Sequence, residues 1–400
     1  MKFTVDRDAL ADAVGWVARA LPARPVVPVL TGMLLSAGQD DSQGPNGSGF
    51  LILSCFDYEV SARVRLRAEV AEPGAVLVPG RLLGEIVRSL PSHPVVFGDD
   101  PDDVSVTCGD AAFLLTPMPI ADYPELPELP QLAGTADGGV LATAIGQVTP
   151  AASRDDTLPM LTAVNVELTE ETMTLAATDR YRLAVRDLGW TPAPGVGEHG
   201  KVAVLVPAKT LADAARMMTP GIPVRIMLRE GGGADGGDAM IGFEAGERRL
   251  TTRLLAGEFI RYRSRFPEEF GCTADLPAEA FAEAVRRVSL VAERGTPVQL
   301  SFAPGRVTIG AATQGQARAR ETVPAEFAGD EPVIAFSPHY LLDGVIAATA
   351  PAAHGDAHAS DAARVRLQFT SPSKPAVITQ HDGPGAGGFR YLVVPQRVQQ

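Results

Sequence analysis

Several features typical of secreted, membrane and metal-binding proteins are scarce in this sequence or missing from it. There are only three cysteines, Cys55, Cys108 and Cys272, and none belongs to a CxxC motif or a Cys/His cluster. We therefore expect reduced thiols in a cytosol rather than a disulfide framework or a zinc site. No apolar run is long enough to cross a bilayer. The N-terminus lacks the basic-then-apolar block of a signal peptide. The sequence predicts a cytoplasmic protein without a membrane segment.

Groups that could form a catalytic or metal site are also sparse. The six histidines are His93, His199, His339, His354, His358 and His381. Most lie in predicted loops, with neither triad nor metal-ligand spacing. His354 and His358 stand in an Ala/Gly/Asp-rich segment, which is more typical of a solvated insertion than of a ligand pair. We predict no catalysis, no cofactor and no metal.

The glycine-rich segments carry no phosphate-binding motif. They span Gly44 to Gly49, Gly231 to Gly237 and Gly383 to Gly388. None forms the strand–GxxxxGK[ST]–helix unit of a phosphate loop. We interpret all three as hairpin loops between strands.

Length and composition indicate a multidomain globular protein. The 400 residues, of which 46% are apolar, can fill two to four domain cores. The net charge of −13 speaks at first against nucleic acid as a partner. A net charge is an average, however, and the distribution of charge along the chain decides the question.

Three segments share one helical pattern of apolar residues. Their apolar positions, each spaced 4, 3 and 4, are Leu10, Val14, Val17 and Leu21; Leu141, Ile145, Val148 and Ala152; and Phe281, Val285, Val288 and Ala292. Each set predicts an amphipathic helix with one core-facing stripe. A single such helix is common, but its recurrence indicates an internal repeat.

A second helical element also recurs three times, in the same order. The copies are VPGRLLGEI from Val78, VPAKTLADA from Val206 and FSPHYLLDG from Phe336. Each has a proline near its start, a basic or imidazole side chain, a leucine and an acid. Proline suits a helix start because the N–H that it lacks has no intrahelical partner there. The proline of the third copy is shifted by one residue.

Predicted strands complete the repeat. They cover Leu51 to Leu53, Val64 to Val70, Val164 to Leu168, Val224 to Leu228, Arg248 to Leu255, Val298 to Phe302, Val365 to Thr370 and Tyr391 to Val394. The sequence therefore predicts an α+β fold of three copies of one domain, each with two helices packed on antiparallel sheets. Domain boundaries are expected near Pro124 to Gly139 and near Phe270 to Leu276.

The repeated helices are less acidic than the rest of the chain. With their flanks they carry a small net positive charge, although the whole chain carries −13. A ring lined by such helices would attract phosphates through screened contacts and could still slide. Its acidic exterior would discourage DNA from binding on the wrong side.

Several sequence segments in order resemble one known family, the β subunit of bacterial DNA polymerase III, most closely its actinobacterial form. They are MKFTVDRDAL at the start, RPVVPVL from Arg24, SCFDYEVSARV from Ser54, VPGRLL from Val78, RDDTLPMLT from Arg154, AATDRYRLAVR from Ala176, LVPAKTL from Leu205, LVAERGTPVQLSF from Leu290 and YLVVPQRV from Tyr391. The resemblance covers nearly the whole chain.

The resemblance implies a DNA sliding clamp, the non-catalytic processivity factor of DNA replication. It implies domains at residues 1–130, 134–267 and 272–400, and a head-to-tail homodimer that closes into a pseudo-sixfold ring. Helices would line the hole around duplex DNA, at the nucleoid. The implied partners are the DNA polymerase III alpha subunit, the clamp loader and other clamp-motif proteins.

The resemblance also implies two sets of site residues. The DNA-contacting candidates are Arg24, Arg81 and, less directly aligned, Arg154. The partner-peptide pocket would contain Leu161, Thr178, Arg180, Tyr181, Arg182, Leu183, Ile260, Ser264, Arg265, Pro375, Leu392, Val394, Pro395, Gln396, Arg397 and Val398. Aliphatic walls with a few polar groups suit an extended peptide. The alternative is that Leu161 and Leu183 are ordinary core residues and the arginines ordinary surface residues.

The chain departs from the family pattern mainly in this pocket. Gln396 stands where the family has an aliphatic or thioether side chain, Ile260 where it commonly has proline, and Arg265 where it has an aliphatic residue. One interpretation is neutral drift. The other is a second-copy clamp whose pocket excludes a cyclic-peptide antibiotic and confers resistance. A scaffold that does not bind DNA also remains open, because the chain is acidic.

Overall fold

The structure is a computed structural model that describes residues 1–39, 49–99, 102–197, 200–231, 239–293, 295–313, 316–350, 363–381 and 388–397. The chain divides into two compact units. Unit 1 contains residues 1–133 and 224–254, and unit 2 contains residues 134–223 and 255–400. In the described part of the chain, no helix is long and apolar enough to cross a membrane.

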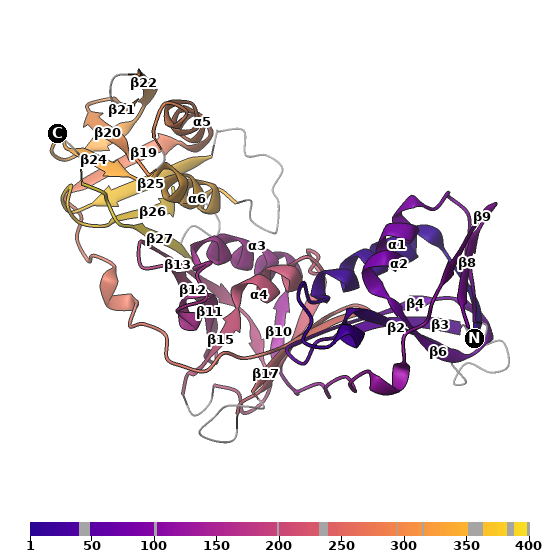
Figure 1. Ribbon diagram of the computed structural model, residues 1–400. Coiled ribbons are helices and arrows are strands. Elements are labelled where there is room, and N and C mark those ends of the chain that lie inside the picture. Colours follow the sequence, from indigo (N-terminus) through magenta and orange to yellow (C-terminus); the bar gives the residue numbers. More distant parts are fainter. Residues whose placement is uncertain are drawn as a thin grey trace. The chain divides into compact units, whose positions relative to one another are not determined.

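Unit 1 contains two helices and two antiparallel sheets. The helices are α1 (Arg7–Val17) and α2 (Gly80–Ser89). The strands are β1 (Lys2–Val5), β2 (Gly32–Gln39), β3 (Gly49–Phe56), β4 (Val60–Arg67), β5 (Glu69–Glu72), β6 (Gly74–Pro79), β7 (Val95–Asp99), β8 (Val104–Cys108), β9 (Ala111–Leu115), β16 (Pro223–Arg229), β17 (Met240–Ala245) and β18 (Arg248–Arg253). One sheet has the order β5-β1-β7-β8-β9, and the other runs β16-β17-β18-β4-β3-β2-β6. Helix α1 packs against α2 and against β3 and β4 (Figure 1).

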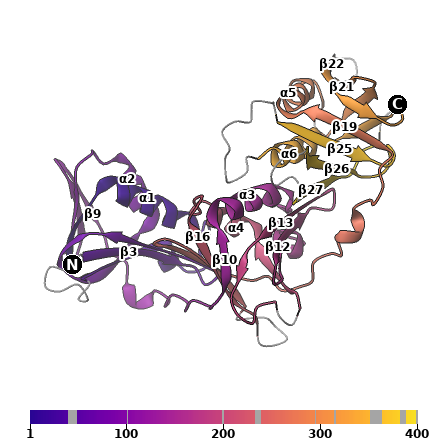
Figure 2. The ribbon, with the colours of Figure 1, turned by 180° about the vertical axis from the view of Figure 1, so that it is seen from behind.

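Unit 2 contains two more helix pairs. Its helices are α3 (Gly138–Val148), α4 (Ala208–Ala215), α5 (Ala278–Ser289) and α6 (Pro338–Ala348). Helix α3 packs against α4, and α5 against α6 (Figure 2). Strand β10 (Gln131–Asp137), which enters this unit, pairs with β14 (Thr191–Pro192). The helix pair predicted for each repeat is therefore present three times in the chain.

Two antiparallel sheets support the helices of unit 2. The strands are β11 (Ala163–Leu168), β12 (Thr172–Thr178), β13 (Arg182–Gly189), β15 (Val202–Pro207), β19 (Cys272–Pro277), β20 (Val298–Ala303), β21 (Arg306–Thr313), β22 (Ala317–Pro324), β23 (Glu326–Ala328), β24 (Val333–Phe336), β25 (Arg364–Phe369), β26 (Ala376–Gln380) and β27 (Phe389–Val393). A nine-stranded sheet has the order β15-β11-β12-β13-β27-β26-β25-β19-β23, and a four-stranded sheet the order β22-β21-β20-β24.

The ends of the helices follow local signals in the sequence. Asp6 caps α1 by accepting a hydrogen bond from Ala9 N at 2.8 Å, and Asp137 caps α3 through Val140 N at 3.0 Å. Such caps stabilise a helix by about 1 kcal/mol. Pro79 and Pro207 directly precede α2 and α4, whereas Pro338 is the first residue of α6. The proline of the third copy thus lies one residue later, inside the first turn of α6, and α6 still forms.

The predicted apolar stripes are buried, but the helices are shorter than the stripes. Leu10, Val14 and Val17 of α1 are buried, whereas Leu21 packs after α1 has ended and a 3-10 turn has followed. Ala152 and Ala292 likewise lie beyond α3 and α5. Pro22 and Pro150 explain the first two early ends, because proline removes a helical hydrogen bond and disfavours helix in the residue before it.

Each predicted strand overlaps a strand of the structure, but some ends differ; β18, for example, ends at Arg253, two residues before the predicted end at Leu255. Val64 to Val70 is not one strand, because β4 ends at Arg67 and β5 begins at Glu69. Residues 44–48, 232–237 and 383–387 of the glycine-rich segments lie outside the described residues, as do His199, His354 and His358. The strands that flank those segments, β2 and β3, β16 and β17, and β26 and β27, are antiparallel neighbours.

Two strand pairings join successive repeats, one pairing in unit 1 and the other in unit 2. We call the pairing of β4 with β18 in unit 1 the first joint, and that of β13 with β27 in unit 2 the second joint. In both, the helices cover one face of the sheet. We call the opposite face the outer face. All three cysteines are buried and none is disulfide-bonded.

Candidate functional site

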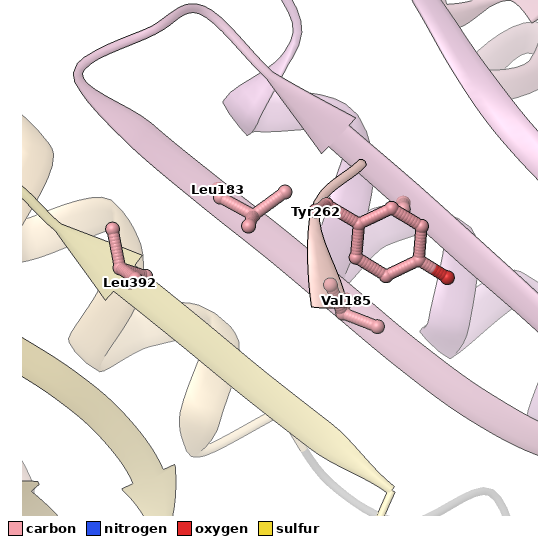
Figure 3. Packing of buried hydrophobic residues seen from close by; sticks show 5 residues of the cluster. Leu183, Val185, Tyr262 and Leu392 are labelled. Carbon is pink, nitrogen blue, oxygen red and sulfur yellow. The ribbon is translucent and has the colours of Figure 1, made fainter. Parts of the chain in front are cut away.

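The outer face of the second joint carries a buried apolar cluster. Leu183 of β13 lies directly opposite Leu392 of β27. Val185, Ala176 and Tyr262 complete the cluster (Figure 3), and the partly buried side chains of Phe259, Phe266 and Val394 pack against it. Two of the predicted pocket residues, Leu183 and Leu392, are therefore in one cluster, and Val394 lies at its edge. The cluster can supply the apolar floor of a binding site.

A tight turn between β12 and β13 borders this cluster. Asp179 accepts hydrogen bonds from the backbone N–H groups of Tyr181 (3.0 Å) and Arg182 (3.1 Å). Thr178 Oγ1 accepts one from Arg180 N at 3.1 Å and donates one to Arg182 O at 2.6 Å. Arg180 has a φ of +82°, in the left-handed region that non-glycine residues rarely adopt. The side-chain bonds hold this conformation and leave Tyr181 54% exposed at the rim.

The side chain of Arg182 turns toward the helix face rather than toward the cluster. Its guanidinium, in a residue only 6% exposed, binds Asp179 and also Asp343 of α6. It lies 4.5 Å from the centre of the Tyr340 ring. Arg182 therefore fastens the turn to α6, a role that the predicted pocket function did not include.

The charge of Arg182 is fixed by this network. Burial would lower the pKa of its guanidinium, but Tyr391, Asp343 and Asp179 together raise that pKa above its ordinary value. Burial also raises the pKa of the Tyr391 hydroxyl. That hydroxyl donates a hydrogen bond to Tyr340 O at 2.9 Å.

The C-terminal segment continues β27 along the same turn. Val394 N donates a hydrogen bond to Tyr181 O at 2.9 Å, and Gln396 N donates one to Ala335 O of β24 at 2.8 Å. The side chains of Gln396 and Arg397 are exposed, whereas Pro395 and Pro375 are partly buried. Val398 lies outside the described residues. The backbone bonds fix the path of the segment, so its exposed side chains can vary without changing the fold.

The connector formed by residues 257–266 crosses the outer face at Tyr262. The Tyr262 ring is buried in the apolar cluster, 5.9 Å from the Phe259 ring. On the other side of Tyr262 the connector closes a pocket of about 520 Å³ over β11 and β15. Ile260 and Ser264 line this second pocket and are not in the cluster with Leu183. Arg265 is exposed.

A buried carboxylate anchors the connector over the second pocket. Glu167, 4% exposed, binds Lys201 Nζ at 2.9 Å and Arg263 Nη1 at 2.8 Å. Burial would raise the pKa of Glu167, but the hydrogen bonds from Lys201 and Arg263 lower it overall. Burial and the nearby Glu167 raise the pKa of the Tyr262 hydroxyl. The ion pair of Arg263 and the buried ring of Tyr262 thus both hold the connector on the outer face.

The structure shows contributors to the site that the sequence patterns did not identify. Tyr262, Phe259, Phe266 and Val185 form much of the cluster, and Asp343 holds Arg182. The sequence signal for a buried Tyr262 was weak: a single tyrosine among the charged residues of EFIRYRSRF. Leu161 is buried in a 3-10 turn before β11, where its carbonyl accepts a hydrogen bond from Ser153 N.

The three candidate arginines for DNA are all exposed. Arg81 stands in the first turn of α2 and donates a hydrogen bond to Pro22 O at 3.0 Å. This bond brings its guanidinium close to the loop that carries Arg24 in unit 1. Arg154 lies in unit 2, after the 3-10 turn that follows α3. All three side chains are therefore accessible to solvent.

Comparison with known proteins gives a consistent result along the whole chain. Models of the N-terminal, central and C-terminal domains of the DNA polymerase III beta subunit match residues 1–127, 135–260 and 263–397. A beta sliding clamp from Streptomyces coelicolor is 46% identical, with all of both chains covered. A beta sliding clamp homolog GriR from Streptomyces muensis is 40% identical over 99% of each.

Solved structures agree. A sliding clamp from Pseudomonas aeruginosa, solved bound to griselimycin, is 26% identical, with full coverage of both chains and a TM-score of 0.83. The three consecutive domain matches confirm the threefold repeat that the sequence predicted. The chain belongs to the family of the DNA polymerase III beta subunit, the bacterial beta sliding clamp.

Proposed function

We propose that this chain acts as a processivity ring: two copies meet head to tail, encircle duplex DNA and tether polymerases without catalysing a reaction. The observation that carries this proposal is the helix pair present once in each of three repeats, α1–α2, α3–α4 and α5–α6. We place the domains at residues 1–130, 134–267 and 272–400. Such a ring would work in the cytoplasm, at the nucleoid.

Two exposed sheet edges support the head-to-tail dimer. Strand β9 ends one sheet of unit 1, and its Leu114 is 70% exposed. Strand β22 ends the four-stranded sheet of unit 2, and Leu290, next to α5, is 83% exposed. An edge strand with unpaired backbone groups and an exposed leucine is a ready pairing surface. The two edges differ, so pairing between them is heterologous, as a closed ring of identical subunits requires.

The ring would hold DNA through few and weak contacts. Arg24, Arg81 and Arg154 are exposed and can approach phosphates, which carry no sequence information. Few charged contacts favour sliding over tight binding. Retention of the protein on nicked circular DNA, and its loss when the circle is cut, would separate topological linkage from ordinary binding. Equal retention on circular and linear DNA would contradict the ring.

The apolar cluster of the second joint suits an extended partner peptide. We infer that polymerase III alpha, the clamp loader and other clamp-motif proteins insert an aliphatic or aromatic anchor beside Leu183, Leu392 and Val394. Burial of the anchor would give the affinity, and polar groups of the turn would set the register. Tyr181, which is exposed at the rim, would cover the bound peptide.

We further propose that the altered pocket distinguishes natural partners from a cyclic-peptide inhibitor. One relative with this fold binds griselimycin. Gln396 and Arg265 are exposed here, and Ile260 lines the neighbouring pocket. These side chains can therefore change without disturbing the floor. Binding of griselimycin and of a polymerase-derived clamp peptide should be measured side by side. A loss confined to griselimycin, relative to an ordinary clamp, supports resistance. Equal retention of both ligands supports neutral drift.

A further inference from the structure

The outer face of the first joint carries a row of charged side chains fixed by strand register. Arg225 of β16 lies opposite Glu244 of β17, Glu244 opposite Arg249 of β18, and Arg249 opposite Arg63 of β4. Directly paired residues of an antiparallel sheet point to the same face, and neighbouring strands are about 4.8 Å apart. One row therefore holds three arginines and one glutamate.

Two more arginines extend this row along β4. Arg65 and Arg67 follow Arg63 at every second position, so all three point to the outer face, roughly 7 Å apart. All three are exposed, whereas Ala62 and Val64 on the helix face are buried. We call Arg63, Arg65, Arg67, Arg225 and Arg249 the arginine face. It lies in unit 1 on the side of the sheet away from α1.

Two glutamates border the arginine face in the described part of the chain. Glu244, 8% exposed, binds Arg225 Nη1 at 2.6 Å and also binds Arg249. Glu247 borders the face in the turn between β17 and β18, where its carbonyl accepts a hydrogen bond from Arg65 N. Partial burial, then Arg249 and Arg65, lower the pKa of Arg63. Like charges paired directly across strands are destabilising, and a bound anion would remove that cost.

The shape and chemistry of the face indicate which anion it would bind. The segment that holds Tyr123 and Glu128 crosses the same sheet next to these arginines. Tyr123 Oη accepts a hydrogen bond from Phe56 N at 2.7 Å, and Arg229 donates one to Glu128 O at 3.3 Å. Beside it, the side chains of Arg63, Arg65, Arg67 and Arg225 are exposed and that of Arg249 is partly exposed. Guanidinium forks bind phosphates in a bidentate manner. The spacing along β4 is comparable with that of successive phosphates in an extended single strand.

An aromatic ring adds a stacking surface. Phe50 of β3 is partly exposed, and the Arg65 guanidinium lies 4.3 Å from its ring centre. Bases of single strands stack on aromatic and guanidinium planes without sequence preference, beside a basic track for the backbone. We propose that the arginine face binds single-stranded nucleic acid on the outside of the clamp, away from the helices. The helices remain the surface for duplex DNA.

The test uses the full-length protein and a fluorescent oligodeoxythymidylate of roughly 20 nucleotides, followed by anisotropy. The double variant Arg63→Gln/Arg65→Gln should lower affinity about tenfold and reduce the slope of log K against log salt by about 1.4. Arg63→Lys/Arg65→Lys should restore the slope and part of the affinity, because it keeps the charge without the fork. Retention on nicked circles should be unchanged, which also verifies folding.

The matched control removes the same number of arginines from the helix side. Arg24→Gln/Arg81→Gln should change oligonucleotide affinity less than twofold and weaken retention on nicked circles. The proposal is overturned if this control removes oligonucleotide binding and the face variant does not. It is also overturned if an equimolar polyaspartate peptide displaces the oligonucleotide, since the face would then be a site for acidic peptides. Both outcomes leave the ring function standing.

Discussion

The two joints between repeats share one backbone design and differ in the chemistry of their outer faces. In the second joint, Leu183 and Leu392 lie opposite each other, and Tyr262 of the connector packs in the same apolar cluster. In the first joint, the corresponding face pairs Ser61 with Thr251 and Arg63 with Arg249. Strand pairing uses backbone groups alone, so it leaves these side chains free to differ. Equivalent joints can therefore provide an apolar peptide floor in one place and a basic face in another.

The helix faces of the two joints also differ in how an arginine is held. Arg182 is buried between Asp179 and Asp343. Arg248 of the first joint binds Asp12 of α1, whose side chain is 70% exposed, and lies 5.7 Å from the Trp16 ring centre. The chain has two tryptophans, Trp16 in unit 1 and Trp190 in unit 2. Single-tryptophan variants can therefore report the unfolding of each unit separately.

The largest expected effect is at the buried arginine. Arg182→Met should lower the stability of unit 2 by about 3 kcal/mol, because it leaves the carboxylates of Asp179 and Asp343 without their cation in a buried site. Urea unfolding followed through Trp190 measures this loss. Arg248→Met is the matched control and should cost less than about 1 kcal/mol, followed through Trp16, because solvent screens its partner. Equal losses would show that burial does not distinguish the joints.

The next effect tests the apolar floor. Leu183→Ala should cost about 3 kcal/mol through the cavity that it leaves and should also weaken binding of a clamp-motif peptide. Leu250→Ala removes a side chain that is 2% exposed on the helix face of the first joint. It should cost a similar amount without changing peptide affinity. Loss of peptide binding in both variants would mean that general destabilisation, rather than the floor, controls the affinity.

A smaller effect is expected from the buried hydroxyl pair of the first joint. Ser61 Oγ and Thr251 Oγ1 are 2.7 Å apart and both residues are buried. Ser61→Ala should cost about 1–2 kcal/mol because the Thr251 hydroxyl loses its partner, whereas Ser61→Ala/Thr251→Val should be nearly neutral. Urea unfolding through Trp16 measures both. A double variant less stable than the single would contradict this account.

The smallest effect concerns pH and the connector of the second joint. The pKa of Glu167 is lowered from its ordinary value of 4.5 in the folded state. Its contribution to stability is therefore complete above about pH 4.5 and is lost as pH falls through the lower, folded pKa. Glu167→Gln should flatten the fall in melting temperature over this acidic range. Arg63→Gln, at the first joint, is the control and should leave the fall unchanged. An unchanged acid slope in Glu167→Gln would contradict the role of this carboxylate.

Much of the fold could be predicted because the relevant signals are local. Apolar spacings of 4, 3 and 4 predicted α1, α3 and α5, and VPGRLLGEI and its relatives predicted α2, α4 and α6. Leu183 and Leu392 were assigned to one pocket through the family resemblance, and the strand register of the second joint does place them together. The ends of the helices were predicted less well, since each apolar stripe continues past the last residue of its helix.

The direction of individual side chains could not be predicted. Arg182 and Ile260 stand in segments that the sequence assigned to the pocket, yet Arg182 turns to Asp343 and Ile260 lines a neighbouring pocket. Asp343 is 161 residues from Arg182 in the chain, and no local pattern links the two. Partners so distant become neighbours only when β13 pairs with β27.

The sequence by itself determined the threefold repeat, the helix pairs and the family, since each is written in local periodicity or in ordered motifs. Only the tertiary structure decided which arginines lie together on the arginine face. Arg63, Arg225 and Arg249 come from three separate strands, and the sequence gives no sign that they share a row. The register of three successive strand pairings sets that row. Register depends on long-range packing, because a slip of one residue would turn each of these side chains to the other face.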